Sequence, residues 1–267
     1  MGTLDGKAVI VTGGAGGIGS GSSQLLAREG AAVVVADIPA MAPRALAEEL
    51  AASGHRAIGV EVDITDEGQV EAMAKAAVAA FGRIDGLHAN AAATRLVATD
   101  GLLTELPRSD FEDAFQVNVI GTWLCCKHVI PVMVEQGGGS IVATSSGAAT
   151  HGDIRNTAYG VTKAGVNQLM RTVATQFGRQ GVRANTVMPG LIIHRGTEFL
   201  PEQFKQVMLD NVLTPELGGP EAIASFVAYL FSDAARYVQG QSIHVDGGMH
   251  VHVPQLASIL AQQTPLF

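Results

Sequence analysis

Tyr159 and Lys163 lie four positions apart in a segment whose pattern predicts a helix beginning near Thr157. At this spacing both side chains project from one helix face, one turn apart. An ammonium close to a phenol favours the phenolate. We therefore expect the pKa of Tyr159 to move from about 10 toward neutrality. Such a tyrosine could act as general base for an alcohol or general acid for a ketone.

Two serines precede this pair at the end of a predicted strand over residues 140–145. Ser146 lies thirteen residues before Tyr159, and its hydroxyl could hydrogen-bond the reacting oxygen of the same substrate. Ser145 is the competing serine.

A glycine-rich loop, residues 13–19, follows the first predicted strand, residues 7–12, and precedes a predicted helix over residues 20–29. Glycines allow a sharp turn and a close approach to a pyrophosphate, and a helix N-terminus offers N–H donors to the phosphates. A turn without a ligand is the alternative. The strand-loop-helix context favours a dinucleotide site that includes Gly13, Gly16, Gly17, Ile18 and Gly19.

Asp37 ends the second predicted strand, residues 32–37, eighteen residues beyond Gly19. A carboxylate there can accept hydrogen bonds from the adenosine ribose and would repel the 2′-phosphate of NADP. Neither Gly16 nor Ile38 offers the basic side chain that this phosphate would need. The predicted cofactor is NAD.

Asp63 ends the third predicted strand, residues 56–63, and is followed by Ile64. We expect both residues at the cofactor, with the Asp63 carboxylate receiving the adenine amino group. A strand-end aspartate or a helix N-cap before Thr65 and Asp66 is the alternative.

The segments that must position these residues alternate between short β-branched runs and longer helical patterns. Further strands are predicted over residues 84–90, 140–145, 183–188 and 242–245, and near-continuous apolar runs of this kind are typical of buried parallel sheets. The alternation predicts a single doubly wound Rossmann fold: a seven-stranded parallel sheet with helices on both faces and a ligand crevice at the carboxyl ends of the strands. Residues 1–249 would form this domain and residues 250–267 a C-terminal extension.

The composition excludes several classes of protein. Hydrophobic residues make up 47% of the chain and charged residues 16%, too little charge for disorder. A net charge of −8 has the wrong sign for holding nucleic-acid phosphates. The longest apolar run, residues 222–231, is too short to cross a membrane, and the N-terminus lacks the pattern of a secretory signal. We expect a cytoplasmic protein without nucleic-acid or membrane partners.

Residues that could hold a metal do not form an evident set. Cys125 and Cys126 are adjacent in a predicted helix and are expected to be buried apolar residues. His250 and His252 alternate, so in an extended segment both would face one side. No third ligand accompanies them, and a solvated pair is favoured over zinc. We predict no metal.

Spaced motifs occur together in one order along the chain. They are Thr12-Gly13-x-x-x-Gly17-x-Gly19, Asp63, Asn90-Ala91, Asn118, Ser146, Tyr159-x-x-x-Lys163, Asn185-x-x-x-Pro189-Gly190 and Val245-Asp246-Gly247-Gly248. In these motifs residues 5–249 resemble the short-chain dehydrogenase/reductase family, in its NAD-type form of about 250 residues.

The resemblance implies roles for these residues. Ser146, which the family spacing favours over Ser145, would polarise the substrate oxygen. Tyr159 would exchange its proton, and Lys163 would bind the nicotinamide ribose and lower the tyrosine pKa. Asn118, in a helix predicted from about residue 111 to 136, would hold a water that links Lys163 to solvent.

The resemblance also implies cofactor contacts and an assembly. The cofactor would touch Asn90, Ala91, Pro189, Gly190 and Ile192. A homotetramer would pack through the predicted helices over residues 111–136 and 157–180.

The chain departs from the family pattern after Pro189-Gly190, where the family commonly has a threonine that bonds the nicotinamide carboxamide. This chain reads Leu191-Ile192-Ile193-His194-Arg195-Gly196-Thr197. His194 replacing that hydrogen bond, Thr197 reaching back, and loss of the contact are the three alternatives that the sequence leaves open.

Substrate selectivity is expected from segments over the strand ends: residues 93–108, 147–156, 191–214 and the tail. Residues 191–214 are apolar enough for a lid over a hydrophobic substrate, and an ordinary amphipathic surface helix is the alternative. His151 is a substrate contact or a loop histidine in water. The predicted substrate contacts are Ser146, Ala148, His151, Tyr159, Leu191, His194, Phe199 and Met208.

The tail carries an apolar stripe that should cover the pocket or dock on another subunit. Its residues are Leu256, Ile259, Leu260, Leu266 and Phe267.

Together these features predict an NAD-dependent oxidoreductase that interconverts a secondary alcohol and a ketone, with oxidation favoured. The substrate would be hydrophobic, for example cyclic or steroid-sized. The alternatives are a 3-oxoacyl-thioester reductase, an epimerase or dehydratase of the same fold, and a non-catalytic NAD-binding scaffold.

Overall fold

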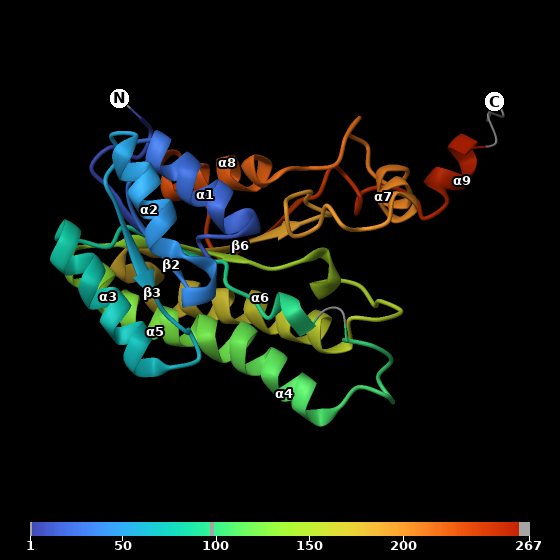
Figure 1. Cartoon of the computed structure of the whole chain (residues 1–267), viewed down its shortest axis with the longest axis horizontal. Helices are drawn as coiled ribbons and strands as arrows, with labels where there is room; N and C mark the ends of the chain where they lie inside the picture. The colour runs from blue at the N-terminus through green and yellow to red at the C-terminus, as the bar shows by residue number, and fades with distance from the viewer. Residues whose placement is uncertain (1, 97–98, 262–267) are drawn as a thin grey trace.

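The computed structural model describes residues 2–96 and 99–261. In these residues seven parallel strands form one sheet in the order β3-β2-β1-β4-β5-β6-β7 (Figure 1). The strands are β1 (Ala8–Thr12), β2 (Ala32–Asp37), β3 (Ala57–Glu61), β4 (Gly86–Ala89), β5 (Gly139–Thr144), β6 (Val182–Pro189) and β7 (Ser242–Val245). The predicted seven-stranded parallel sheet is confirmed, and its order reverses between β1 and β4, where a ligand crevice is expected.

Two helical layers cover the sheet because side chains alternate between its faces. Val33 and Val35 of β2 belong to one core cluster, and Val34 and Ala36 belong to the other. The first cluster lies under α1 (Gly17–Arg28), α2 (Pro43–Ala52) and α8 (Pro220–Phe231). The second lies under α3 (Glu67–Phe81), α5 (Thr122–Glu135) and α6 (Thr157–Phe177), on the opposite side of the sheet in Figure 1. The predicted doubly wound Rossmann fold is therefore confirmed.

The helix predicted over residues 111–136 has a wider turn in its middle. It consists of α4 (Arg108–Phe115), a π-helical segment (Gln116–Gly121) and α5. The π-helical segment contains Asn118, and it ends at Gly121, where an added Cβ would lie 2.6 Å from Cδ1 of Ile64. Segments of this kind are frequent at functional sites.

The same continuous helix is long and apolar enough, by composition, to cross a membrane. It spans Arg108–Glu135 and contains an 18-residue window of mean hydropathy 1.5. Half of the window is buried inside the fold, where Cys125 and Cys126 lie in the core as predicted. A core helix of an α/β fold passes the same test.

The chain leaves β7 through turns and bends rather than as an extended segment. Gly247 and Gly248 adopt positive φ angles of 66° and 85°, which favour glycine and turn the chain. The extended conformation expected around His250 and His252 is therefore wrong. The chain continues to α9 (Leu256–Ala261), which lies at the same end of the molecule as α7 (Glu202–Leu209), on the right in Figure 1. Leu266 and Phe267 of the predicted stripe lie outside the described residues.

Candidate active site

The glycine-rich loop is held to the end of β4 by Asn90 and Thr12. The Asn90 side-chain amide donates to the backbone oxygens of Thr12 and Gly13, both at 3.3 Å. The backbone N–H groups of Asn90 and Ala91 donate to the Thr12 hydroxyl at 3.1 and 3.3 Å. Asn90 and Ala91 thus shape the loop that the cofactor is predicted to occupy.

Several glycines of the loop have no room for a side chain. A Cβ on Gly19 would lie 1.9 Å from the backbone oxygen of Gly13, and Gly13 itself has a φ of +62°. α1 begins at Gly17, and its N-cap Gly16 makes no side-chain cap hydrogen bond. The first turn of α1 therefore presents backbone N–H groups without a side-chain cap, as a pyrophosphate requires. Ile18, the other predicted loop contact, is partly buried against the core beneath α1.

Asp37 at the end of β2 turns its carboxylate toward this loop. Its Oδ2 accepts from the Ala15 N–H at 3.0 Å, and its Oδ1 accepts from the Ile38 N–H at 2.9 Å. Burial raises the pKa of Asp37, and the two backbone hydrogen bonds act in the opposite direction. The neighbouring Ile38 and Met41 are apolar and 45% and 44% exposed, so no positive charge is contributed at these two positions.

Asp63 and Ile64 follow β3. The Oδ1 atom of Asp63 accepts from both the N–H and the hydroxyl of Thr65, at 2.9 and 2.8 Å. The helix N-cap is Asp66, which accepts from Gln69 N–H, so the capping alternative for Asp63 is wrong. Ile64 is buried in the core against Gly121.

Ser146, Tyr159 and Lys163 meet beside the carboxyl end of β5. Burial raises the pKa of Tyr159, and a hydrogen bond with the adjacent Ser146 side chain acts in the opposite direction. The Lys163 ammonium lies 5.6 Å from the centroid of the Tyr159 ring. Ser145 is buried, and its hydroxyl donates to the backbone oxygen of Lys163 at 3.2 Å. The geometry thus puts Ser146 beside the tyrosine and leaves Ser145 supporting α6.

The N-terminus of α6 is capped by Asp100, a residue that the sequence reasoning missed. Its two carboxylate oxygens accept from the backbone N–H groups of Ala158 and Tyr159 at 3.0 and 2.7 Å. The residue before α6, Asn156, makes no side-chain cap hydrogen bond. Asp100 is 5% exposed and lies 59 positions from Tyr159, so no local pattern could have found it.

Asn118 also positions the tyrosine helix. Its side-chain oxygen accepts from Ala93 N–H at 2.8 Å, and its side-chain nitrogen donates to the Thr162 hydroxyl at 2.9 Å. That hydroxyl donates to the backbone oxygen of Tyr159 at 2.9 Å. The Asn118 side chain is therefore engaged in these two contacts, and the water at Asn118 stays a prediction.

The predicted lowering of the Tyr159 pKa is wrong for the chain by itself. Burial raises this pKa, and the hydrogen bond from Ser146 lowers it to a smaller extent. Lys163 does not offset the effect of burial, because its ammonium faces the ring and donates to the backbone oxygen of Thr144 at 2.7 Å. Lys163 is 3% exposed, and burial lowers its own pKa to about 8.

The buried Lys163 predicts a pH-dependent stability. Above about pH 8 the folded chain loses this proton, while the unfolded chain keeps it up to about 10.5. The unfolded state then binds more protons, so the Lys163 contribution makes the free energy of unfolding rise with pH, by on the order of 3 kcal/mol across this window. Denaturant unfolding of wild type and Lys163→Met between pH 7 and about 10 should show this rise as a growing difference between the two.

Lys75→Met is the matched control, because Lys75 is exposed and ion-paired with Glu71 on the surface of α3. Its pH profile should parallel that of the wild type. A Lys163→Met profile that also runs parallel to the wild type would contradict a lowered pKa at Lys163.

Comparison with known proteins bears on this arrangement. A family model described as enoyl-(acyl carrier protein) reductase matches residues 13–250. A probable short-chain type dehydrogenase/reductase of Bradyrhizobium diazoefficiens is 40% identical over 261 residues, covering 96% of this chain and 92% of that protein. The chain belongs to the short-chain dehydrogenase/reductase family. One further relative is named for its substrate, and one solved structure contains a named cofactor and ligand.

The 7alpha-hydroxysteroid dehydrogenase of Bacteroides fragilis is 35% identical over 257 residues, covering 96% of this chain and 99% of that protein. A solved 7 alpha-hydroxysteroid dehydrogenase, complexed with NADH and 7-oxo glycochenodeoxycholic acid, is 34% identical with a TM-score of 0.86. The match covers 92% of this chain and 94% of that one. The residues of the glycine-rich loop thus fit a nicotinamide cofactor, as members of the short-chain dehydrogenase/reductase family use.

His194 is one of the two side chains that could replace the family's threonine after Pro189-Gly190. Its Nδ1 accepts from Gly196 N–H at 3.0 Å, so Nε2 carries the proton of the neutral ring. A Cβ added to Gly17 would lie 3.2 Å from that Nε2, so the ring lies against the first residue of α1. Burial lowers the pKa of His194.

Thr197 is engaged within its own loop. Its hydroxyl accepts from His194 N–H at 2.9 Å and lies 2.9 Å from the backbone oxygen of Ile192, to which it donates. Ile192 is buried, Pro189 ends β6 opposite Val245 of β7, and Gly190 follows it. Of the three alternatives, the contacts favour His194 as the side chain nearest the cofactor loop.

The predicted substrate contacts divide into two groups. Ala148 and His151 lie close to Ser146: Ala148 N–H donates to the Ser146 hydroxyl at 3.2 Å, and His151 follows a short 3-10 helix, Gly147–Ala149. Leu191 and Met208 are half-buried, whereas Phe199 is 79% exposed. α7 has no buried residue, so the segment proposed as a lid lies on the surface in this structure.

His250 and His252 do not act as a pair. His252 Nε2 bonds the backbone oxygen of Asn211 at 2.8 Å, and its pKa is raised by this and a second backbone hydrogen bond. His250 Nδ1 instead contacts Asp246, beside His244. Within the described residues, His244, Asp246 and His250 have side-chain atoms close enough to hold one ion, and His252 is not part of this group.

Proposed function

We propose that this enzyme is an NAD-dependent oxidoreductase that interconverts a secondary alcohol and a ketone, with oxidation favoured. The observation that carries the proposal is the grouping of Ser146, Tyr159 and Lys163 at the carboxyl ends of the strands, beside a glycine loop suited to a dinucleotide. A proton-transferring group next to a nicotinamide site is what alcohol oxidation requires.

Each of the three side chains has a task in this reaction. When bound, the cofactor would supply the hydride acceptor for the substrate carbon. Ser146 donates a hydrogen bond to the reacting oxygen, and the Tyr159 oxygen takes the hydroxyl proton. Lys163 has three N–H donors, of which one is used on Thr144, so the others are available for the nicotinamide ribose.

The ammonium of Lys163 and the positive ring of the oxidised cofactor together would oppose the effect of burial on Tyr159. Both charges favour the phenolate, whereas burial favours the phenol. Cofactor binding therefore prepares the tyrosine for proton removal in this proposal.

The choice of NAD over NADP is supported by Asp37. Its carboxylate lies at Ala15 of the glycine loop, and the exposed neighbours Ile38 and Met41 are apolar. A 2′-phosphate placed beside a carboxylate without a compensating cation is repelled. We propose that the enzyme is cytoplasmic. Because we expect the cytosolic NAD pool to be mostly oxidised, oxidation of the alcohol is the favoured direction.

A hydrophobic substrate is supported by the segments around the crevice and by the relatives. Large apolar side chains are strongly exposed in three of the four segments predicted to recognise the substrate, namely Leu103, Ile154, Phe199 and Leu213. One relative is named for a hydroxysteroid, and the solved structure holds a bile-acid derivative. We propose a cyclic or steroid-sized alcohol.

A 3-oxoacyl-thioester reductase is the second candidate, and the description of the family model as an acyl carrier protein reductase favours it. A large acidic carrier would need a basic docking patch. Arg95 and Arg108, in the segment nearest α4, are already paired with Asp113 and Glu112 at 3.5 and 2.7 Å. These ion pairs support the alcohol dehydrogenase over the carrier-dependent reductase.

The homotetramer is proposed to form through α4, α5 and α6. Phe115, Trp123 and Val161 are 38%, 43% and 51% exposed in a single chain. Exposed apolar side chains on neighbouring helices are typical of subunit interfaces.

The proposal is tested by measuring NAD reduction with a panel of hydrophobic secondary alcohols, including 7-hydroxylated bile acids and substituted cyclohexanols. We expect turnover with at least one of them, and faster turnover with NAD than with NADP. The same assay run in reverse with 3-oxoacyl thioesters tests the second candidate. If the protein binds NADH but reduces NAD with none of the alcohols, an epimerase, a dehydratase or a non-catalytic scaffold would be favoured.

A further inference from the structure

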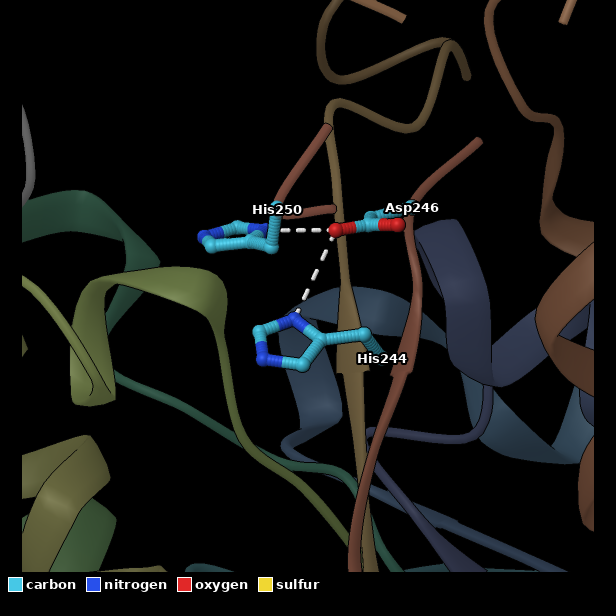
Figure 2. Close-up of side chains that lie close together, drawn as sticks. All are labelled: His244, Asp246 and His250. Atoms are coloured by element: carbon cyan, nitrogen blue, oxygen red, sulfur yellow. Dashed lines mark hydrogen bonds and ion pairs between the residues drawn. The ribbon is translucent and has the colours of Figure 1, made fainter. Parts of the chain in front are cut away.

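A cluster of three side chains at the end of β7 is not used in the proposed hydride transfer. His244 belongs to β7, Asp246 follows it, and His250 comes from the turn beyond. Figure 2 shows both imidazole rings facing one carboxylate oxygen of Asp246. Nδ1 of His250 and Nδ1 of His244 lie 2.5 and 3.5 Å from this Oδ2 atom.

The three atoms have the chemistry and spacing of a metal site. One ligand atom from each residue lies within 4.8 Å of the other two. Zn²⁺ bonds of about 2.0–2.1 Å in a tetrahedron place ligand atoms about 3.4 Å apart. The two distances to Oδ2 lie on either side of that value, and the two imidazole nitrogens lie within 4.8 Å of each other.

The ring nitrogen of His244 is the observation that most directly indicates a bound ion. Its Nδ1 is buried and has no hydrogen-bond partner within the described residues, although it points at the Asp246 carboxylate. The carboxylate oxygen that it faces is already bonded to His250. A buried ring nitrogen without a partner is costly, and a metal ion at the centre of the cluster would satisfy it.

The surroundings supply the outer contacts that metal ligands usually have. Nε2 of His250 lies 3.1 Å from Nδ1 of His151, and Oδ1 of Asp246 accepts from Gly248 N–H at 2.9 Å. A histidine that ligates through one nitrogen typically donates from the other, and such contacts orient the ligand. Asp246 is 5% exposed as a side chain, so its direction is fixed by packing as well.

We propose that His244, Asp246 and His250 bind one divalent transition-metal ion, with Zn²⁺ the best match to two imidazoles and one carboxylate. The fourth position is left to water, as in zinc sites with three protein ligands. Ligation through Nδ1 requires the neutral His250 tautomer whose single proton is on Nε2, and this N–H donates to Nδ1 of His151. The ion fastens β7, the C-terminal segment and the loop after Ser146 to one another.

The test uses protein whose affinity tag has been removed, because a polyhistidine tag binds the same metals. The chain is treated with a chelator, dialysed against Zn²⁺ and analysed for metal per chain. We expect one equivalent in the wild type, and its loss in His244→Asn and in His250→Asn. His252→Asn should keep it, since His252 lies two positions from His250 but bonds Asn211 instead. His151→Asn should weaken binding about 10–100-fold.

A second measurement, the unfolding temperature with and without Zn²⁺, does not depend on catalytic activity. Zn²⁺ should raise the unfolding temperature of the wild type and of His252→Asn, and leave His244→Asn and His250→Asn unchanged. If either variant does not fold, the visible absorption spectrum of wild-type protein loaded with Co²⁺ tests the site instead. We expect the spectrum of tetrahedral Co²⁺, which differs from that of hexa-aqua Co²⁺. No bound equivalent in the wild type, or equal binding by His250→Asn, would overturn the proposal and leave an Asp246–His250 ion pair.

Discussion

Tyr159→Phe is expected to lower kcat/KM by about 10²–10⁴-fold, the usual contribution of a positioned acid or base. The ring remains beside the Lys163 ammonium, so only the oxygen that takes the proton is lost. Steady-state kinetics with the best alcohol of the panel measure the loss, and NADH fluorescence measures cofactor affinity, which should stay within a few fold of the wild type.

Tyr237→Phe is the control for this change, because Tyr237 is 98% exposed and lies outside the site. It should retain full turnover. Near-normal turnover by Tyr159→Phe would show that another group moves the proton. A loss of cofactor binding in the same variant would instead point to a structural role for the phenol.

Asp37→Ala is expected to weaken NAD binding about 10–100-fold and to narrow the preference for NAD over NADP. Hydrogen bonds to a charged acceptor contribute about 1.5–3 kcal/mol, and each tenfold change in affinity corresponds to about 1.4 kcal/mol. Loss of the carboxylate also removes the repulsion of a 2′-phosphate. Dissociation constants for both cofactors give the two effects separately.

Asp37→Asn distinguishes charge from loop geometry. The amide oxygen can still accept from Ala15 N–H, so the loop keeps its contact while the negative charge is lost. Asp233→Asn is the surface control, since Asp233 pairs with Lys7 before the start of β1. If Asp37→Ala and Asp37→Asn both kept the wild-type ratio of NAD to NADP affinity, Asp37 would not determine cofactor preference.

Most of the fold was predictable because its signals are short-range. Each of the seven predicted strands is present, with ends shifted by at most a few residues. The glycine loop was also predictable, because Gly13 and Gly19 act within one strand-loop-helix unit. The wider turn at Asn118 was not, since it arises where the helix passes Ile64, a residue far away in the sequence.

The sequence predicted which residues form the candidate site but not the direction in which the pKa of Tyr159 is shifted. The four-residue spacing of Tyr159 and Lys163 places them on one face of any helix. The direction of the Tyr159 pKa depends on how deeply the ring is buried and on where the Lys163 ammonium points. Both are set by the packing of α6 on β5, which no local pattern records.

By itself the sequence determined the alternation of strands and helices, the phosphate loop and the identity of the candidate proton-transfer residues, because backbone preference and side-chain period act over a few positions. Only the tertiary structure decided that Asp100 caps α6, that burial governs the pKa of Lys163, and that His244, Asp246 and His250 converge. Each of these features depends on segments that lie apart in the sequence and that the sheet and its turns bring together. The burial of the Lys163 ammonium and the arrangement of the three candidate metal ligands exist only once those segments are packed.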